Sequence, residues 1–192
     1  MTEFNKSLDT LYGILVDNYE DFENKVKELI LTPEQIPDTN KFNWLLSQFI
    51  NKPSFIDPFL LTINKSNKGD KWLNDYLFGV VNLIDNVSGD EEFEIPEGLI
   101  DKLGVWLNDN KGELSWKAAT LLKYFESQTV EQIQLTKLQE RGDFFLTYVE
   151  CILGLLRYDR EKHIEFVKEI SLDQTRDPKL IEFAMDTYKN YR

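Results

Sequence analysis

Few side chains in this chain of 192 residues have the chemistry of a nucleophile or of a transition-metal ligand. The chain holds one histidine, His163, and one cysteine, Cys151. His163 has charged neighbours on a predicted helix, and a general base needs a positioned partner and a pocket, so we expect a solvent-exposed side chain. Cys151 lies in an apolar stretch, whereas a reactive thiol needs electropositive surroundings, so we expect a buried structural thiol. These counts exclude a disulfide framework and a Cys-based or His-cluster metal site.

Any catalysis would therefore depend on carboxylates, and the chain has 34 of them. The run Asp90-Glu91-Glu92 could offer oxygen ligands to a hard cation, but a solvated loop is the favoured interpretation. No spacing singles out an acid–base pair, and no Gly-rich phosphate loop, GxSxG or HExxH motif is present. We expect no enzymatic activity, no metal and no cofactor, with a carboxylate-dependent hydrolase or lyase as the least favoured alternative.

The balance of charge indicates the class of partner. Lys and Arg number 22, which gives a net charge of −12. Nucleic-acid phosphates and anionic membrane surfaces would be repelled, and a basic protein is the electrostatically suited partner. The alternative is that the acidic surface only keeps the protein soluble. The first residues lack the features of a signal peptide, and the longest nearly apolar run, 144–156, is shorter than a membrane span, so we expect a cytoplasmic protein.

The acidic residues are unevenly distributed along the chain. Residues 72–101 contain eight acids and no base, whereas residues from 129 onward carry 12 acids and 10 bases. We expect an acidic loop over 88–95, which with its flanks would steer a basic partner and bond to its Arg or Lys side chains. Tryptophans beside an inter-helix turn could add interface anchors. The predicted partner-binding residues are Asp85, Asp90, Glu91, Glu92, Glu94, Glu97, Asp101, Trp106 and Trp116.

The elements that would position these residues are predicted to be helices. Apolar residues recur at spacings of three and four almost throughout, which predicts an all-α protein, and the length predicts one domain. Thr32 is predicted to cap a single turn that Pro37 ends, Thr129 to cap a helix, and Asp177 to cap the last helix. The predicted helices cover roughly 3–18, 19–31, 41–51, a stretch from 57, 69–86, 96–108, 113–127, 129–141, 143–158, 159–171 and 178–190.

A repeat is the most informative feature of the second half. Ala119, Cys151 and Ala184 lie in the second helices of three successive predicted pairs, at spacings of 32 and 33 residues. Gly79 has a similar apolar setting 40 residues before Ala119. A small side chain once per pair lets neighbouring helices approach closely, and a period of this length is typical of stacked helical arrays.

The clearest unit of this repeat resembles a HEAT-type repeat. Its first helix runs Leu-Ile-Asp-Lys-Leu over 99–103, followed by Trp-Leu-Asn-Asp at 106–109, and its second helix carries Trp-Lys-Ala-Ala at 116–119. The arginine usual in the second helix is missing, and Lys117 is the nearest base. The resemblance implies a HEAT-like α-solenoid of antiparallel helix pairs over 69–192, preceded by less regular helices over 1–68. An irregular α-helical bundle is the alternative.

Small, acidic, HEAT-like proteins are similar to the immunity proteins of bacterial polymorphic toxin systems. That resemblance implies a protein-binding module that binds and neutralises a toxin by covering a basic active site. The Asn- and Lys-rich, Ala-poor composition is typical of an AT-rich bacterial genome. A general adaptor or scaffold of HEAT-like type is the second hypothesis, and a toxin gene beside this one would favour the first. The sequence indicates no oligomeric state.

Overall fold

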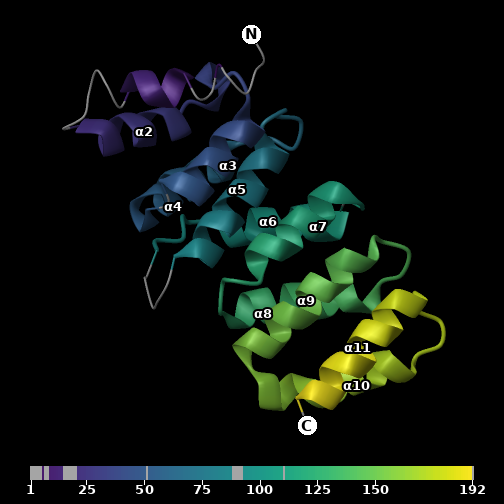
Figure 1. The fold of residues 1–192 in the computed structure, drawn as a ribbon. Helices are drawn as coiled ribbons and strands as arrows, with labels where there is room; N and C mark the ends of the chain where they lie inside the picture. Colours follow the sequence, from purple (N-terminus) through teal and green to yellow (C-terminus); the bar gives the residue numbers. More distant parts are fainter. Residues whose placement is uncertain are drawn as a thin grey trace. The chain divides into compact units, whose positions relative to one another are not determined.

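The computed structural model describes residues 6, 9–14, 21–50, 52–87, 93–109 and 111–191. Helices and their connections make up all of these residues, and no strand occurs among them, so the all-α prediction is confirmed (Figure 1). In addition to helical residues 9–14, the elements are α2 (Phe22–Ile30), η2 (Pro33–Gln35), α3 (Thr39–Phe49), η3 (Pro53–Phe55), α4 (Ile56–Lys65), α5 (Leu73–Asn86), α6 (Leu99–Asp109), α7 (Glu113–Leu122), α8 (Gln128–Gln139), α9 (Phe145–Tyr158), α10 (Arg160–Leu172) and α11 (Pro178–Asn190).

The chain forms two compact units, residues 1–99 and residues 100–192. This division falls about thirty residues after the change of pattern at 68/69 that the sequence shows. Within the described residues, no helix has the length and apolar character needed to cross a lipid bilayer.

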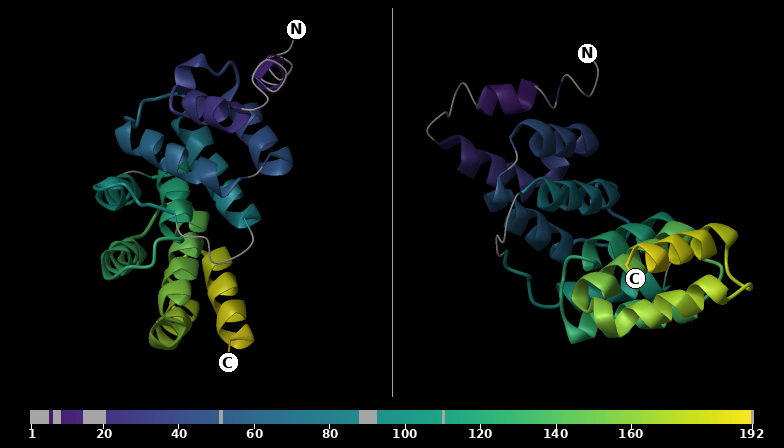
Figure 2. Two further views of the ribbon diagram at one scale, coloured as in Figure 1. Left: turned by 90° about the vertical axis from the view of Figure 1, so that its left-hand side faces the viewer. Right: turned by 60° about the horizontal axis from the view of Figure 1, so that its bottom comes forward.

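In the first unit, α5 packs against both α3 and α4, and α2 packs against α4 (Figures 1 and 2). The centre of this packing is Tyr76 on α5, which is fully buried. Its ring lies edge-on to Phe59 of α4 at a centroid distance of 4.7 Å, and its hydroxyl donates a hydrogen bond of 3.0 Å to the carbonyl of Ile30. Because a buried hydroxyl without a partner is costly, this bond fixes the end of α2 against α5.

In the second unit, α9 packs against α7, α8, α10 and α11, and α10 and α11 form a helical hairpin (Figures 1 and 2). Ala119 of α7, Cys151 of α9 and Ala184 of α11 are all fully buried. The expectation that these small residues lie where helices pack is confirmed, and so is the structural, buried character of Cys151. Burial raises the pKa of the Cys151 thiol far above its ordinary value, so it stays protonated.

Several helix ends differ from prediction because side chains cap the backbone elsewhere. Helix α8 begins at Gln128, since the Ser127 hydroxyl, and not Thr129, accepts the Val130 N–H. Thr32 does not cap its turn, because its hydroxyl donates to the carbonyl of Glu28 in the preceding helix. The predicted single turn is confirmed as η2, and Asp177 caps α11 as predicted by accepting the Lys179 N–H.

Candidate functional site

The predicted acidic residues that the structure describes are exposed. Asp85, Glu94 and Glu97 lie in the first unit, and Asp101 lies on α6. The segment that carries Glu94 and Glu97 is attached to α4 through its backbone. Asp57 accepts the N–H of Glu94 at 3.1 Å, and Asn64 donates to the carbonyl of Glu97 at 2.9 Å. Asp90, Glu91 and Glu92, the middle of the predicted loop, lie outside the described residues.

The two tryptophans named as anchors have different surroundings. Trp106 is only 6% exposed and belongs to the core, so its ring offers no anchor on the surface. Trp116 is partly exposed and packs edge-on against Phe144, with ring centroids 5.9 Å apart. Phe144 is 42% exposed and also contacts Phe145 at 5.7 Å. Of the two predicted anchors, Trp116 alone remains accessible, at the edge of this aromatic cluster.

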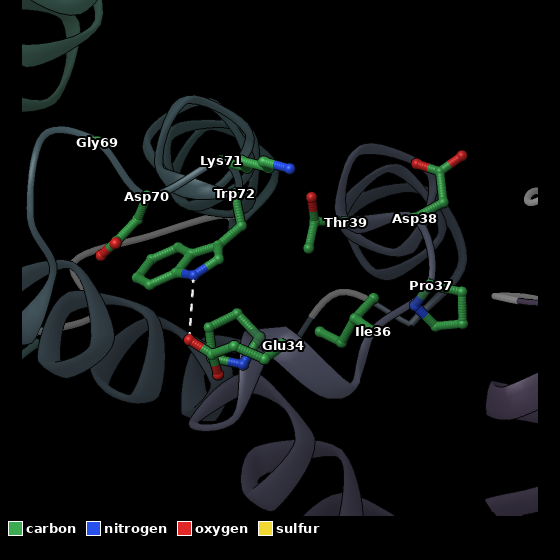
Figure 3. A pocket seen from close by; sticks show the side chains of 10 residues that line it. Glu34, Ile36, Pro37, Asp38, Thr39, Gly69, Asp70, Lys71 and Trp72 are labelled. Atoms are coloured by element: carbon green, nitrogen blue, oxygen red, sulfur yellow. Dashed lines mark hydrogen bonds between the residues drawn. The ribbon is translucent and has the colours of Figure 1, made fainter.

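The first unit contains an open cavity of about 590 Å³ that the sequence did not reveal (Figure 3). Pro33, Glu34 and residues 36–39 form one wall, and residues 69–72 form the other. A second cavity of about 300 Å³ lies beside it. Pro33, Glu34, Asp70 and Trp72 line both cavities. These four residues are therefore the shared part of a continuous concave surface.

Backbone turns form both walls of the larger cavity. On one side, η2 ends after a single turn and Pro37 follows, and the Asp38 carboxylate starts α3 by accepting the Lys41 N–H at 3.0 Å. On the other side, Asp70 accepts the Asn67 N–H at 2.8 Å and donates its own N–H to the Asn67 carbonyl. This turn delays the start of α5 to Leu73, so the helix predicted from Gly69 is four residues shorter.

The cavity combines an indole ring with carboxylates. The Trp72 Nε1–H donates to Glu34 Oε1 at 3.3 Å (Figure 3). The Trp72 ring also packs against buried Tyr76, with centroids 4.9 Å apart. Burial and then the nearby Glu34 charge raise the pKa of the Tyr76 hydroxyl far above its ordinary value, so Tyr76 is neutral. Three acids and one base line the larger cavity, which therefore favours a cation: Glu34, Asp38, Asp70 and Lys71.

His163 lies in the other unit, and the prediction for it was wrong. Its side chain is buried, with 3% exposed, and its Nε2 lies 2.7 Å from Oε1 of Glu131. Lys162 approaches the same oxygen at 2.5 Å. Mainly because of the Lys162 ammonium, the pKa of Glu131 is below its ordinary value despite burial. The charged neighbours of His163 along α10 could not show that Glu131 of α8 places a buried carboxylate beside it.

A buried ion pair elsewhere in this unit was also missed by the sequence interpretation. The side chains of Lys137 and Asp143 are both 0% exposed, with Nζ and Oδ2 2.8 Å apart. Asp143 was predicted to start a helix, but α9 starts at Phe145. Asp143 instead accepts the Gly112 N–H at 2.8 Å and the Ser115 hydroxyl at 2.7 Å. This network joins the starts of α7 and α9 to the end of α8.

The described residues contain no group of three or more His, Cys, Asp or Glu side chains arranged to hold a metal ion. On α9 and α10, Arg157 forms an ion pair with Glu126, and Lys168 forms one with Glu165. One signal could have located the cavity: Asn67, Gly69 and Asp70 are turn-forming residues directly before an apolar helix.

The chain matches no protein-family model, no curated protein and no solved structure.

Proposed function

We propose that this protein is an acidic protein-binding module whose partner is a basic protein. The observation that carries the proposal is the concentration of negative charge in one unit. Residues 1–99 contain 18 acids and 8 bases, whereas residues 100–192 contain 16 acids and 14 bases. Clustered charge of one sign speeds association with a partner of the opposite sign, and it disfavours partners of the same sign.

Ion pairing within the protein leaves much of this charge for a partner. In the first unit, the ion pairs found among described residues use Glu23 and Glu28. Glu94 and Glu97 are exposed and form no ion pair with a described residue. In the second unit, by contrast, basic side chains on α9 and α10 are matched by nearby acids. The charges of Glu94 and Glu97 are therefore available for recognition.

The scaffold that we propose for the second unit is a HEAT-like stack of helix pairs. Helix α9 packs against both α7 and α11, and the fully buried Ala119, Cys151 and Ala184 lie on these helices at spacings of 32 and 33 residues. Such stacks present extended surfaces to protein partners. We propose further that the partner is a toxin domain and that binding covers its basic active site.

The test begins with affinity capture from the source organism and identification of the partner by mass spectrometry. Association of the purified partner is then measured for a Glu94→Lys/Glu97→Lys double variant and for a matched Glu161→Lys/Glu182→Lys control on the near-neutral unit. We expect the first variant to slow association at least tenfold at low salt and to flatten its salt dependence, because electrostatic steering acts on the association rate. An unchanged association rate would refute the proposal.

The toxin assignment has its own assay. Expression of the captured partner alone should arrest bacterial growth, and co-expression of this protein should restore it. A partner that is harmless when expressed alone would instead support the general adaptor or scaffold function.

A further inference from the structure

We infer that the cavity lined by Glu34, Asp70 and Trp72 receives an arginine side chain of the basic partner. In this complex, the guanidinium stacks on the Trp72 indole and bonds to the Glu34 and Asp70 carboxylates. The inference rests on the proposed function, because it names the chemical group that the acidic unit recognises. It uses residues outside the predicted acidic loop.

The aromatic surface of the cavity is held in place by the core. The Trp72 ring lies against Tyr76, with an interplanar angle of 60°. Tyr76 itself is fixed by its bond to Ile30 and by its edge-on contact with Phe59. The indole N–H is directed at Glu34 Oε1, so the ring and this carboxylate have a defined mutual orientation (Figure 3). A ligand that binds here does not have to order them, which reduces the entropic cost of binding.

The carboxylates keep the capacity to accept further hydrogen bonds. Glu34 accepts the indole N–H through Oε1, and Asp70 accepts the Asn67 N–H through Oδ2. An ionised carboxylate has about four lone-pair sites, so each group can accept additional N–H donors from a ligand. Both residues line the two adjoining cavities, as does Trp72, which places them along the same concave surface.

Arginine fits this surface better than the other charged side chains. An anionic group would meet three carboxylates, which Lys71 in the larger cavity and Lys65 in the smaller one offset only in part. Both lysines are exposed, so solvent screens their charge. A guanidinium is planar, has five N–H donors, bonds carboxylates in a bidentate manner and stacks on aromatic rings. A lysine ammonium is a compact, strongly hydrated charge that cannot stack in this way.

The inference is tested with three capped tripeptides, Gly-Arg-Gly, Gly-Lys-Gly and Gly-citrulline-Gly, titrated into the full chain. Citrulline matches the shape of arginine but carries no charge. The readout is the indole N–H resonance of Trp72 in ¹H–¹⁵N NMR spectra, assigned with a Trp72→Phe variant. We expect the arginine peptide to shift this resonance saturably, the lysine peptide to bind more weakly, and the citrulline peptide to leave it unchanged. No shift with the arginine peptide, or equal binding of the citrulline peptide, would overturn the inference.

Two conservative variants test the carboxylates. Glu34→Gln and Asp70→Asn keep hydrogen-bond acceptors but remove the charge, and each should weaken arginine-peptide binding about tenfold, the range expected for a charge-assisted hydrogen bond. Glu182→Gln, an exposed position on α11 of the other unit, is the control and should bind with unchanged affinity. Dispersed amide spectra establish that each variant is folded. Unchanged affinity in both cavity variants contradicts the inference.

The captured partner separates this inference from the proposed function. If Glu94→Lys/Glu97→Lys slows association while Glu34→Gln and Asp70→Asn leave affinity for the partner unchanged, the cavity inference fails and the proposed function stands. If the arginine peptide binds at Trp72 but every captured partner is acidic or neutral, the proposed function fails. In that case the assignment of the arginine to a basic partner fails with it.

Discussion

At the scale of single residues, buried charge in the second unit predicts a large effect from one substitution. Asp143→Ala removes the carboxylate that faces the Lys137 ammonium, where both side chains are 0% exposed. Lys137 keeps an ion pair with Glu140 at 3.0 Å, but the Gly112 N–H and the Ser115 hydroxyl lose their acceptor. Breaking a buried charge pair costs about 3–5 kcal/mol, so we expect a loss of up to this order in the free energy of unfolding. Urea denaturation followed by circular dichroism measures it.

An exposed pair provides the matched control. Asp186 lies 3.9 Å from Lys189, and both side chains are about two-thirds exposed. Because solvent screens such pairs, Asp186→Ala should change stability by less than about 0.5 kcal/mol. Equal effects of the two substitutions would mean that the buried network does not stabilise the fold.

Glu23 predicts how stability responds to acid. Hydrogen bonds from Lys52 and Ser54, together with Lys27, lower the pKa of Glu23 from 4.5 to about 2. The unfolded chain then binds a proton more readily than the folded chain, so the stabilisation is present above pH 4.5 and is lost as the pH falls towards 2. Glu23→Gln should therefore show a shallower decline of melting temperature across this window. Glu28→Gln is the control and should show the same decline as the unmodified protein. If the melting temperature of Glu23→Gln also falls as steeply as that of the unmodified protein, the assignment is contradicted.

Residue environments were only partly predictable from sequence. The burial of Cys151 followed from its apolar neighbours along the helix. The burial of His163 did not, because the residue that accompanies it, Glu131, lies 32 positions earlier on α8. The pattern of charged residues along one helix predicts which face of that helix is polar. It does not predict that a second helix packs against this polar face and buries it.

At the scale of elements, Gly79 determines how closely α3 and α5 approach. A Cβ at this position would lie 2.7 Å from Nδ2 and 2.8 Å from Cβ of Asn43. It would displace the bond that Asn43 donates to the Asp75 carbonyl. We expect Gly79→Ala to destabilise the protein, because overpacking costs about 1–3 kcal/mol and the gain in helix propensity, about 1 kcal/mol, offsets only part of it.

Gly13 is the matched control for this substitution. It lies in helical residues 9–14, and a Cβ there meets no atom within 4 Å. Gly13→Ala should be neutral or should stabilise by up to about 1 kcal/mol through helix propensity. Thermal denaturation of both variants measures the change in melting temperature that each substitution causes. A stabilising effect of Gly79→Ala would show that the two helices can separate without cost.

Some helices start where neighbouring residues in the sequence cap them, and others start where contacts with distant helices determine the backbone. Asp177 and Pro178 determine the start of α11 through the backbone beside them, and the sequence predicted this start. The start of α9 was predicted two residues early, because Asp143 bonds to α7 and α8 and does not cap its own helix.

At the scale of the whole molecule, the distribution of charge predicts a response to salt. Raising the ionic strength from about 0.01 M to 0.15 M shortens the Debye length from about 30 Å to 8 Å. Residues 1–99 carry 18 acids against 8 bases, so screening should reduce their mutual repulsion and raise the melting temperature. The variant Asp85→Asn/Glu94→Gln/Glu97→Gln should respond less. A melting temperature that falls with salt would show that attractive ion pairs outweigh the repulsion.

The sequence by itself determined the all-helical class, most helix positions, the charge imbalance and the buried small residues of α7, α9 and α11. These properties depend on neighbours within a few turns or on composition, and both can be read along the chain. Only the tertiary structure decided that Glu34 and Trp72, 38 positions apart, meet at one cavity, and that Trp106 is buried while Trp116 is not. Such outcomes depend on which helix faces meet. The helical periodicity of the sequence shows which residues share a face, but it does not show which other helix packs against that face.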